Sequence, residues 1–373
     1  MKKILILLLI LYILISACGS VSSTPTSAHP SDPPTDPVTE EASTALTELQ
    51  LPAGYGVRGS WFELYFTDPT SPLASQETGG PDGLLAEAID GARLSVDVAI
   101  YSLSLNSIRD ALLRAHDRGV RVRMVMESDN LDRSDPQKLV DAGIQILGDR
   151  REGLMHDKFV VIDNSEVWTG SMNFTDSGAY EDNNNLIRIR SEKMAENFTR
   201  EFEEMFRDDR FGPDTVAETP NPRVIIEGTP IDVYFAPDDN VQASFVELVN
   251  NAEESINFLA FSFTADEIGA AVRERADDGV TVSGVMEDDQ VNSNIGTEFD
   301  PFMQARLDVE RDGNPGQMHH KVMIIDENIV ILGSYNFTKS AETRNDENLL
   351  VIYNDAIAAQ FMAEFERVYS QAR

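Results

Sequence analysis

The stretch MHDKFVVID, residues 155–163, returns later in the chain as MHHKVMIID, residues 318–326. After six intervening residues, each copy is followed by a Gly-Ser-x-Asn segment, at residues 170–173 and 333–336. All matching positions of the two copies lie 163 residues apart, as His156 and His319 do. Chance does not hold one register over so many positions, so the pattern predicts a duplicated domain.

The repeat also covers segments that precede these motifs. Residues 95–104, SVDVAIYSLS, match residues 255–264, SINFLAFSFT, and the segments that end at Glu127 and Glu287 match as well. These earlier copies lie 160 residues apart, as though the second half carried three additional residues before its His motif. The duplication therefore extends over most of the chain.

Within each half, short apolar runs alternate with longer amphipathic segments. Residues 107–118 have apolar side chains at helical spacing, and residues 120–126, which follow Gly119, are typical of a strand. Short buried strands separated by helices favour an α/β sandwich with a mixed or mainly parallel sheet. We therefore expect two pseudo-twofold-related α/β halves, at residues 58–210 and 229–373, with a connector at residues 211–228.

The N-terminus has the pattern of a secretory signal peptide. Two lysines precede an apolar run at residues 4–15, which at 1.5 Å per residue spans about 18 Å, well short of a hydrocarbon core of about 30 Å. This length favours a signal peptide at residues 1–17 over a transmembrane anchor. The run LISAC resembles the lipobox of bacterial lipoproteins, which implies lipidation of Cys18 and an extracytoplasmic, membrane-anchored protein. Residues 18–57, rich in Ser, Thr and Pro at their start, are expected to form a disordered tether.

The composition restricts the functional classes. The 373 residues include 64 Asp and Glu against 30 Lys and Arg, a formal net charge of −34. Such a surface repels polyanions on average, which removes the usual electrostatic signature of a dedicated nucleic-acid binder without excluding a local basic cleft. Cys18 is the only cysteine, so the chain can form no intrachain disulfide and no cysteine-based zinc site.

The spacing within His-x-Lys brings two useful side chains together. On a strand, the period of two turns the imidazole and the ammonium toward one face, where both can reach the same small anion. The aspartate that ends each motif has the opposite parity, so we expect Asp163 and Asp326 to be structural. The same parity makes His320 structural, and His116 is placed to cap the end of a helix. The pairs expected to act together are His156 with Lys158 and His319 with Lys321.

Gly-Ser-x-Asn supplies a second set of donors. Its Ser and Asn repeat the i, i+2 spacing, so a strand beside the first would bring hydroxyl and amide groups to the same anion. Its glycine would allow two backbone segments to approach closely. The expected substrate-binding residues are Ser171, Asn173, Ser334 and Asn336, and the expected close approaches are at Gly170 and Gly333.

Packing the halves about a pseudo-twofold axis would create one site with two His, two Lys, two Asn and two Ser. Such a set suits a phosphodiester, because cationic and amide donors can bind the nonbridging oxygens while one imidazole attacks and the other protonates the leaving oxygen. This chemistry needs no metal and no other cofactor. Since one chain carries both halves, a monomer is sufficient.

Both motifs follow His-x-Lys-x4-Asp-x6-Gly-Ser-x-Asn without a gap, and through this pattern the chain resembles the phospholipase D superfamily over nearly all of residues 60–373. The resemblance implies a site at the interface of the halves and a two-step reaction through a phosphohistidine. It implies His156 as the nucleophile and His319 as the general acid and base. The phosphate would be held by Lys158, Lys321, Asn173 and Asn336, with support from Ser171 and Ser334.

The family also uses a carboxylate downstream of each motif to orient its His. Glu347 fits this place in the second half, whereas the first half has Asn184 at the equivalent position. An amide can orient an imidazole but stabilises its cation less than a carboxylate does. Either Glu181 or Asp182 takes over in the first half, or the two histidines differ in pKa.

Members of the superfamily cleave phosphatidyl lipids, cardiolipin or nucleic acids with the same core. The predicted lipid anchor and the acidic surface favour a phospholipid hydrolase. The alternative is a metal-independent extracytoplasmic endonuclease, because residues 333–343 resemble the small secreted endonucleases of the superfamily. A catalytically inactive binding protein is disfavoured by the two intact His motifs. Candidates for a basic rim around a nuclease site are Arg188, Arg190, Lys339 and Arg344.

Overall fold

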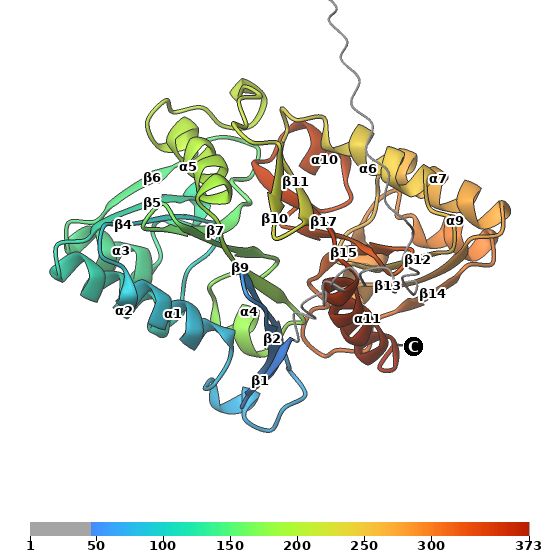
Figure 1. Ribbon diagram of the computed structural model, residues 1–373, viewed down its shortest axis with the longest axis horizontal. Coiled ribbons are helices and arrows are strands. Elements are labelled where there is room, and N and C mark those ends of the chain that lie inside the picture. The colour runs from blue at the N-terminus through green and yellow to red at the C-terminus, as the bar shows by residue number, and fades with distance from the viewer. Residues whose placement is uncertain (1–45, 373) are drawn as a thin grey trace, which may run out of the picture. The chain divides into compact units, whose positions relative to one another are not determined.

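The computed structural model describes residues 46–372, which form two β-sheets with helices packed on them (Figure 1). The first sheet has nine strands and the second has eight, one sheet for each repeat. This confirms the predicted α/β class with two halves. The predicted signal peptide, Cys18 and the first part of the predicted tether lie outside the described residues. Within residues 46–372, no helix combines the length and the apolarity needed to cross a membrane.

The elements follow one another in nearly the same order in both halves. The strands of the first sheet are β1 (Thr47–Leu51), β2 (Gly54–Arg58), β3 (Phe62–Thr67), β4 (Ser95–Ile100), β5 (Arg121–Met126), β6 (Gln145–Gly148), β7 (Lys158–Ile162), β8 (Glu166–Gly170) and β9 (Asn185–Arg190). Those of the second are β10 (Arg223–Ile226), β11 (Thr229–Ala236), β12 (Ser255–Ala260), β13 (Thr281–Met286), β14 (Asp308–Arg311), β15 (Lys321–Ile325), β16 (Ile329–Gly333) and β17 (Glu347–Tyr353). The first-half helices are α1 (Pro81–Gly91), α2 (Asn106–Asp117), α3 (Ser134–Asp141), α4 (Asp176–Tyr180) and α5 (Glu192–Phe206). The second-half helices are α6 (Val241–Asn250), α7 (Asp266–Asp277), α8 (Asp288–Ser293), α9 (Phe299–Gln304), α10 (Lys339–Thr343) and α11 (Asp355–Tyr369). Short 3₁₀ turns are η1 (Ala74–Gln76), η2 (Ser128–Asn130) and η3 (Gly212–Asp214).

The strand order reproduces the sequence repeat. The order β3-β9-β8-β7-β4-β5-β6 in the first sheet corresponds to β11-β17-β16-β15-β12-β13-β14 in the second. In each sheet the last three strands of this order pair with one another in parallel, and all other pairs are antiparallel. The parallel pairs follow from helical crossovers such as α2, which lies where the sequence predicts a helix. The sheets are therefore mixed rather than mainly parallel.

Two predicted boundaries are wrong. The tether does not extend to residue 57, because β1 and β2 form a hairpin that pairs with β3, and Val57 is buried in the core. The connector ends before residue 228, because β10 already pairs with β11 in the second sheet. Strands of four or five residues at the margin of a sheet escape a composition argument, since pairing with a neighbouring strand defines them.

Three apolar cores hold these layers together. One lies under α1 and α2 in the first half and a second under α6 and α7 in the second half. The third core contains residues of both halves and includes the inner faces of α5 and α11. Phe198 of α5 packs edge-on against Phe235 of β11 at 5.1 Å between ring centroids, and Phe361 of α11 packs against Phe66 of β3 at the same 5.1 Å. The helix at the end of each repeat thus packs against the other half.

The motif residues predicted to be structural hold the sheet together. Asp163 accepts hydrogen bonds from the backbone N–H groups of residues 93–95, and Asp326 accepts them from residues 253–255. At Gly170 (φ +152°) an added Cβ would lie 2.3 Å from the Asn185 carbonyl oxygen, and at Gly333 (φ +148°) it would lie 2.2 Å from that of residue 348. Both glycines therefore allow β8 to approach β9 and β16 to approach β17.

Candidate active site

Each His-x-Lys segment is anchored by the other half of the molecule. The lysines are the first residues of β7 and β15, and the preceding histidines lie just outside these strands. The backbone N–H of His156 donates to the Asp346 carbonyl at 2.9 Å, and that of His319 donates to the Asn183 carbonyl at 3.0 Å. The two motifs, far apart in the sequence, are therefore fixed at one interface.

The side chains that orient the imidazoles also come from the opposite half. His156 Nδ1–H donates to Glu347 Oε2 at 2.7 Å, and His319 Nδ1–H donates to Asn184 Oδ1 at 2.9 Å. The Asn184 amide is held in this orientation because its Nδ2 donates to the Gly178 carbonyl at 2.8 Å.

The expectation that each half orients its own His is therefore wrong. Glu347 orients the first-half His and Asn184 orients the second-half His. The reason is that each His motif pairs across the interface with the segment of the other half that contains the orienting residue, Met155 with Asp346 and Met318 with Asn183. Neither Glu181 nor Asp182 takes over this task. The Asp182 carboxylate instead accepts from the backbone N–H of Gln317 at 3.0 Å.

Both rings present Nε2 to the site. With Nδ1–H bound to an oxygen acceptor, the neutral imidazole carries its lone pair on Nε2. Burial lowers the pKa of His156 to about 4, although Glu347 acts in the opposite direction. Burial also lowers the pKa of His319, and the charges of Lys321, Lys158 and His156 add to this effect. Both imidazoles are therefore neutral nucleophiles or bases near pH 7 until an anion enters.

The two lysines are buried beside the histidines. Lys158 Nζ donates to the His156 carbonyl at 2.6 Å, and Lys321 Nζ donates to the His319 carbonyl at 2.7 Å. Burial lowers the pKa of Lys158 to about 8, opposed by the nearby Glu347 carboxylate. Burial and the charge of Lys158 lower the pKa of Lys321. The two ammonium groups are close enough for the charge of one to lower the pKa of the other, and such a pair is well suited to bind one phosphate group.

Two aromatic rings complete the walls, and the motifs did not identify them. The Tyr101 ring lies edge-on to the His156 imidazole, with 5.2 Å between centroids, and 5.4 Å from Lys158 Nζ. Phe261 lies 4.6 Å from the His319 ring and 4.5 Å from Lys321 Nζ. Tyr101 and Phe261 occupy the same position of the 160-residue repeat, so the repeat itself was the available signal.

The serines and asparagines of Gly-Ser-x-Asn have different surroundings. The fully buried Ser171 hydroxyl donates to Asn184 Oδ1 at 2.8 Å, and Ser334 is equally buried and accepts from the backbone N–H of Asn348 at 3.0 Å. The Ser171 hydroxyl thus supports the residue that orients His319, and substrate binding by the two serines stays a prediction. Asn173 and Asn336 are half-buried, and the structure gives their Oδ1 atoms no partner, so they stay candidates for binding.

The remaining histidines lie outside the reacting set, as expected. His116 is in the last turn of α2. His320 is fully buried, and both its ring nitrogens have side-chain partners. Each motif is held further by a glutamate of the repeat: the Met155 N–H donates to Glu127 at 3.0 Å, and the Met318 N–H donates to Glu287 at 2.6 Å.

Two of the four candidates for a basic rim, Arg188 and Arg190, are paired with carboxylates. Arg188 pairs with Glu166 at 2.6 Å and Arg190 pairs with Glu63, both on the part of β9 that leads away from the site. The Arg344 guanidinium lies 3.8 Å from Glu152. The charges of Arg188 and Arg190 are therefore compensated by carboxylates of the same sheet, whereas the exposed contact between Arg344 and Glu152 is weak.

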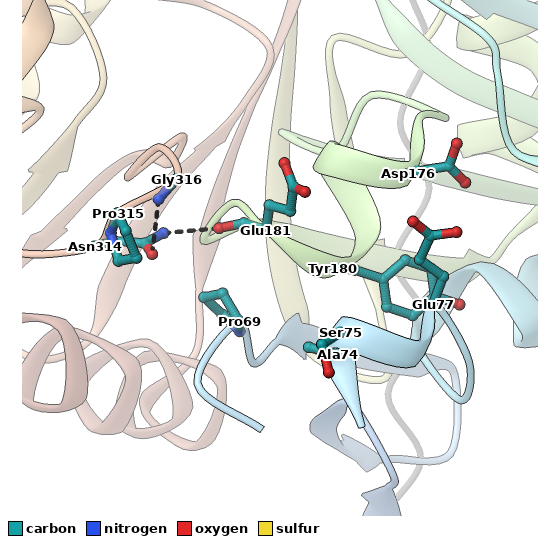
Figure 2. A pocket seen from close by; sticks show the side chains of 10 residues that line it. All are labelled: Pro69, Ala74, Ser75, Glu77, Asp176, Tyr180, Glu181, Asn314, Pro315 and Gly316. Atoms are coloured by element: carbon teal, nitrogen blue, oxygen red, sulfur yellow. Dashed lines mark hydrogen bonds between the residues drawn. The ribbon is translucent and has the colours of Figure 1, made fainter. Parts of the chain in front are cut away.

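A cavity of about 490 Å³ lies between the halves, beside the loops that lead to Asn184 and His319 (Figure 2). Its wall is formed by residues 314–316 of the second half and by first-half residues that include Tyr180 and Glu181, and Asn314 Nδ2 donates to the Glu181 carbonyl at 3.0 Å. None of the four motif His and Lys side chains lines it. Its carboxylates disfavour an anion, so it is not the reaction site.

These features define a class of protein: two α/β repeats that meet around paired His and Lys side chains. The chain belongs to the family described as "Cardiolipin synthase, PLD-like domain", whose model matches residues 85–206 and 245–369. The match covers both halves and confirms the resemblance to the phospholipase D superfamily.

Among curated relatives, the chain is similar to "Phospholipase D" of Rickettsia prowazekii (strain Madrid E), with 33% identity over 135 residues, 35% of this chain and 64% of the relative. It is also similar to the human "Mitochondrial cardiolipin hydrolase", with 35% identity over 120 residues, 32% of this chain and 47% of the relative. The chain thus spans about half to two thirds of the length of these relatives. The solved phosphatidylserine synthase of Haemophilus influenzae Rd KW20 has a TM-score of 0.60 at 12% identity, covering 78% of this chain and 84% of that one, a likeness of fold.

Proposed function

We propose that the protein is a phosphodiesterase of the phospholipase D type that hydrolyses phospholipids through a phosphohistidine at His156. One observation carries this proposal: two imidazoles, each held through Nδ1 by the opposite half, present Nε2 beside two buried ammonium groups. The names of the relatives, phospholipase D and cardiolipin hydrolase, support the reaction class. The acidic surface and the paired arginines of β9 favour a lipid over a nucleic acid.

In the first step, the Nε2 lone pair of His156 attacks phosphorus and the bond from phosphorus to the leaving alcohol breaks. Protonated His319 gives its Nε2 proton to the leaving oxygen. The new P–N bond puts positive charge on the His156 ring, and the Glu347 carboxylate at Nδ1 stabilises that charge. This is why His156 rather than His319 is the proposed nucleophile, since Asn184 offers His319 only a neutral amide.

In the second step, neutral His319 takes a proton from a water molecule, whose oxygen attacks phosphorus as the P–N bond breaks. The His156 ring regains its lone pair and the acid product leaves. Lys158, Lys321, Asn173 and Asn336 are proposed to hold the nonbridging oxygens throughout, because their donors are the polar groups that accompany the imidazoles.

The substrate is tested with purified protein on three substrates at one stated salt concentration. We expect hydrolysis of an aryl phosphodiester and release of headgroup from phospholipid vesicles, both persisting in EDTA. Faster nicking of plasmid DNA than release from vesicles would favour the endonuclease alternative. Activity abolished by EDTA would contradict the metal-free mechanism.

The pH dependence is expected to be a plateau with two limits. Below about pH 4, His156 binds a proton and loses its attacking lone pair, because burial lowers its pKa to about 4. Above about pH 8, Lys158 loses the charge that holds phosphate, because burial lowers its pKa to about 8. Burial and Lys158 also lower the pKa of Lys321, so both lysines contribute to the alkaline limit. Activity of the free enzyme, measured as kcat/KM of the aryl substrate, should therefore fall on both sides. A profile that keeps rising well above pH 8 would contradict the role of Lys158.

We also propose that the chain is a lipoprotein attached to a bacterial membrane through Cys18, on the basis of the LISAC run. Cys18→Ser is then expected to move the protein from the membrane fraction to the soluble fraction of a bacterial lysate, because one lipid-modified residue would supply the attachment. An unchanged distribution would remove the anchor from the proposal and leave the chemistry untouched.

A further inference from the structure

In the second half, a buried glutamate, Glu364, is paired with an imidazole and a guanidinium. His320, the middle residue of its motif, donates from Nε2–H to Glu364 Oε1 at 2.7 Å, and its Nδ1 accepts from Asn185 Nδ2 at 2.9 Å. Glu364 also accepts from Arg367 Nε at 2.7 Å and from the Tyr55 hydroxyl. Both Glu364 oxygens and both His320 ring nitrogens therefore have partners, and both Tyr55 and Asn185 come from the first half.

The first half has only carboxyl groups at the three equivalent positions. Asp157, Glu201 and Glu204 stand 163 residues before His320, Glu364 and Arg367. Asp157 is 0% exposed; its Oδ1 accepts from Asn348 Nδ2 at 2.7 Å, and its Oδ2 has no partner. Glu201 is 5% exposed, and its Oε1 has no partner. The imidazole and the guanidinium of the second half have thus been replaced by acids.

The opposite half adds further acids to this place. Asp238, which follows β11, also has an Oδ1 without a partner. In the described part of the chain, no Lys, Arg or His forms an ion pair with Asp157 or Glu201, and no acidic grouping there could hold a metal ion. The charged groups that act on the pair from every packed element are Lys158, Glu204, Asp238, Asp346 and Glu347.

We propose that Asp157 and Glu201 hold a proton at the interface of the halves, so that this contact is stable in the protonated state and weakened when both carboxyls ionise. An uncompensated buried carboxylate is costly, and protonation is the way to remove that cost. Burial raises the pKa of Asp157 to about 7, and burial together with Asp157 and Asp238 raises the pKa of Glu201.

The sign of the effect follows from these raised pKa values. A carboxyl whose pKa is higher in the folded than in the unfolded protein stabilises the fold below its unfolded value of about 4. That contribution is lost as the pH rises through the folded value, about 7 for Asp157 and raised for Glu201. Alkaline pH should therefore loosen the first-half side of the interface, where α5 and the loop after β11 meet.

The test is thermal unfolding of Glu201→Gln and of the unchanged protein from about pH 5 to about pH 9. The amide copies the protonated carboxyl, so the variant should match the unchanged protein near pH 5 and melt at least about 2–4 °C higher near pH 9. Parallel curves would overturn the proposal, and so would a variant that fails to fold. The outcome is independent of any phosphodiesterase activity.

The chain supplies its own matched control. Glu364→Gln occupies the equivalent position of the second half but removes the carboxylate that faces Arg367 and His320, so it should lower the melting temperature at every pH. Infrared spectra give a second readout. The carbonyl band of protonated carboxyls should be weaker in Asp157→Asn than in the unchanged protein at neutral pH, and this difference should disappear at alkaline pH, where Asp157 ionises. Spectra of the unchanged protein and Asp157→Asn that do not differ would contradict the proposal.

Discussion

His156→Ala and His319→Ala are each expected to reduce hydrolysis of a phosphodiester by about 10²–10⁴-fold or more. The first removes the attacking Nε2 and the second removes the proton donor, and the nearest other histidine, His320, is engaged at both ring nitrogens. The measurement is the steady-state kcat on an aryl phosphodiester, which includes both steps, with circular dichroism as a check of folding. His116→Ala is the matched control, because it replaces a histidine in α2 outside the site and should leave the rate unchanged.

The two histidine variants should fail at different steps. An aryl leaving group needs little proton donation, so His319→Ala should still form the P–N bond but hydrolyse it slowly, and a labelled phosphoryl group should accumulate on the protein. His156→Ala should not become labelled. Label on His156→Ala and none on His319→Ala would assign the nucleophile to His319 and contradict the proposed order.

The sequence repeat was sufficient for the parts of this picture that depend on local spacing. The motif spacing correctly paired His156 with Lys158, although His156 precedes β7 and the strand period does not apply to it. Asp163 is structural, as its hydrogen bonds to residues 93–95 show, although it lies in the turn after β7. The close approaches at Gly170 and Gly333 followed from the same pattern. Each of these features lies within one motif or between neighbouring strands.

The features that could not be predicted depend on how one half meets the other. Periodicity states which face of a strand a side chain occupies, but not which element packs there. It therefore could not show that Glu347 crosses to His156, 191 residues away, or that Asn184 crosses to His319, 135 residues away. The same limit applies to Ser171. The motif predicts that its hydroxyl binds the phosphate, whereas in the structure this hydroxyl donates to Asn184 Oδ1.

Because Glu347 of the second half orients His156 of the first half, a second strong effect is expected when Glu347 is replaced. Glu347→Gln keeps an oxygen acceptor for His156 Nδ1–H but removes the charge that stabilises the phosphorylated ring, so kcat should fall by about 10²–10⁴-fold. Because Glu347 also raises the pKa of Lys158, the alkaline limit of activity should move to lower pH. If each half instead oriented its own histidine, the variant would impair His319, and labelled protein would accumulate as in His319→Ala.

The reciprocal change tests whether the carboxylate determines which histidine attacks. Asn184→Asp places a carboxylate against His319 Nδ1 and should raise the pKa of that imidazole, which shifts the acidic limit of activity upward. The double variant Glu347→Gln with Asn184→Asp moves the single carboxylate from one ring to the other. It is expected to recover activity relative to Glu347→Gln alone and to carry the label on His319, located by peptide mapping. Label that stays on His156 would mean that substrate orientation, rather than the carboxylate, decides which histidine is the nucleophile.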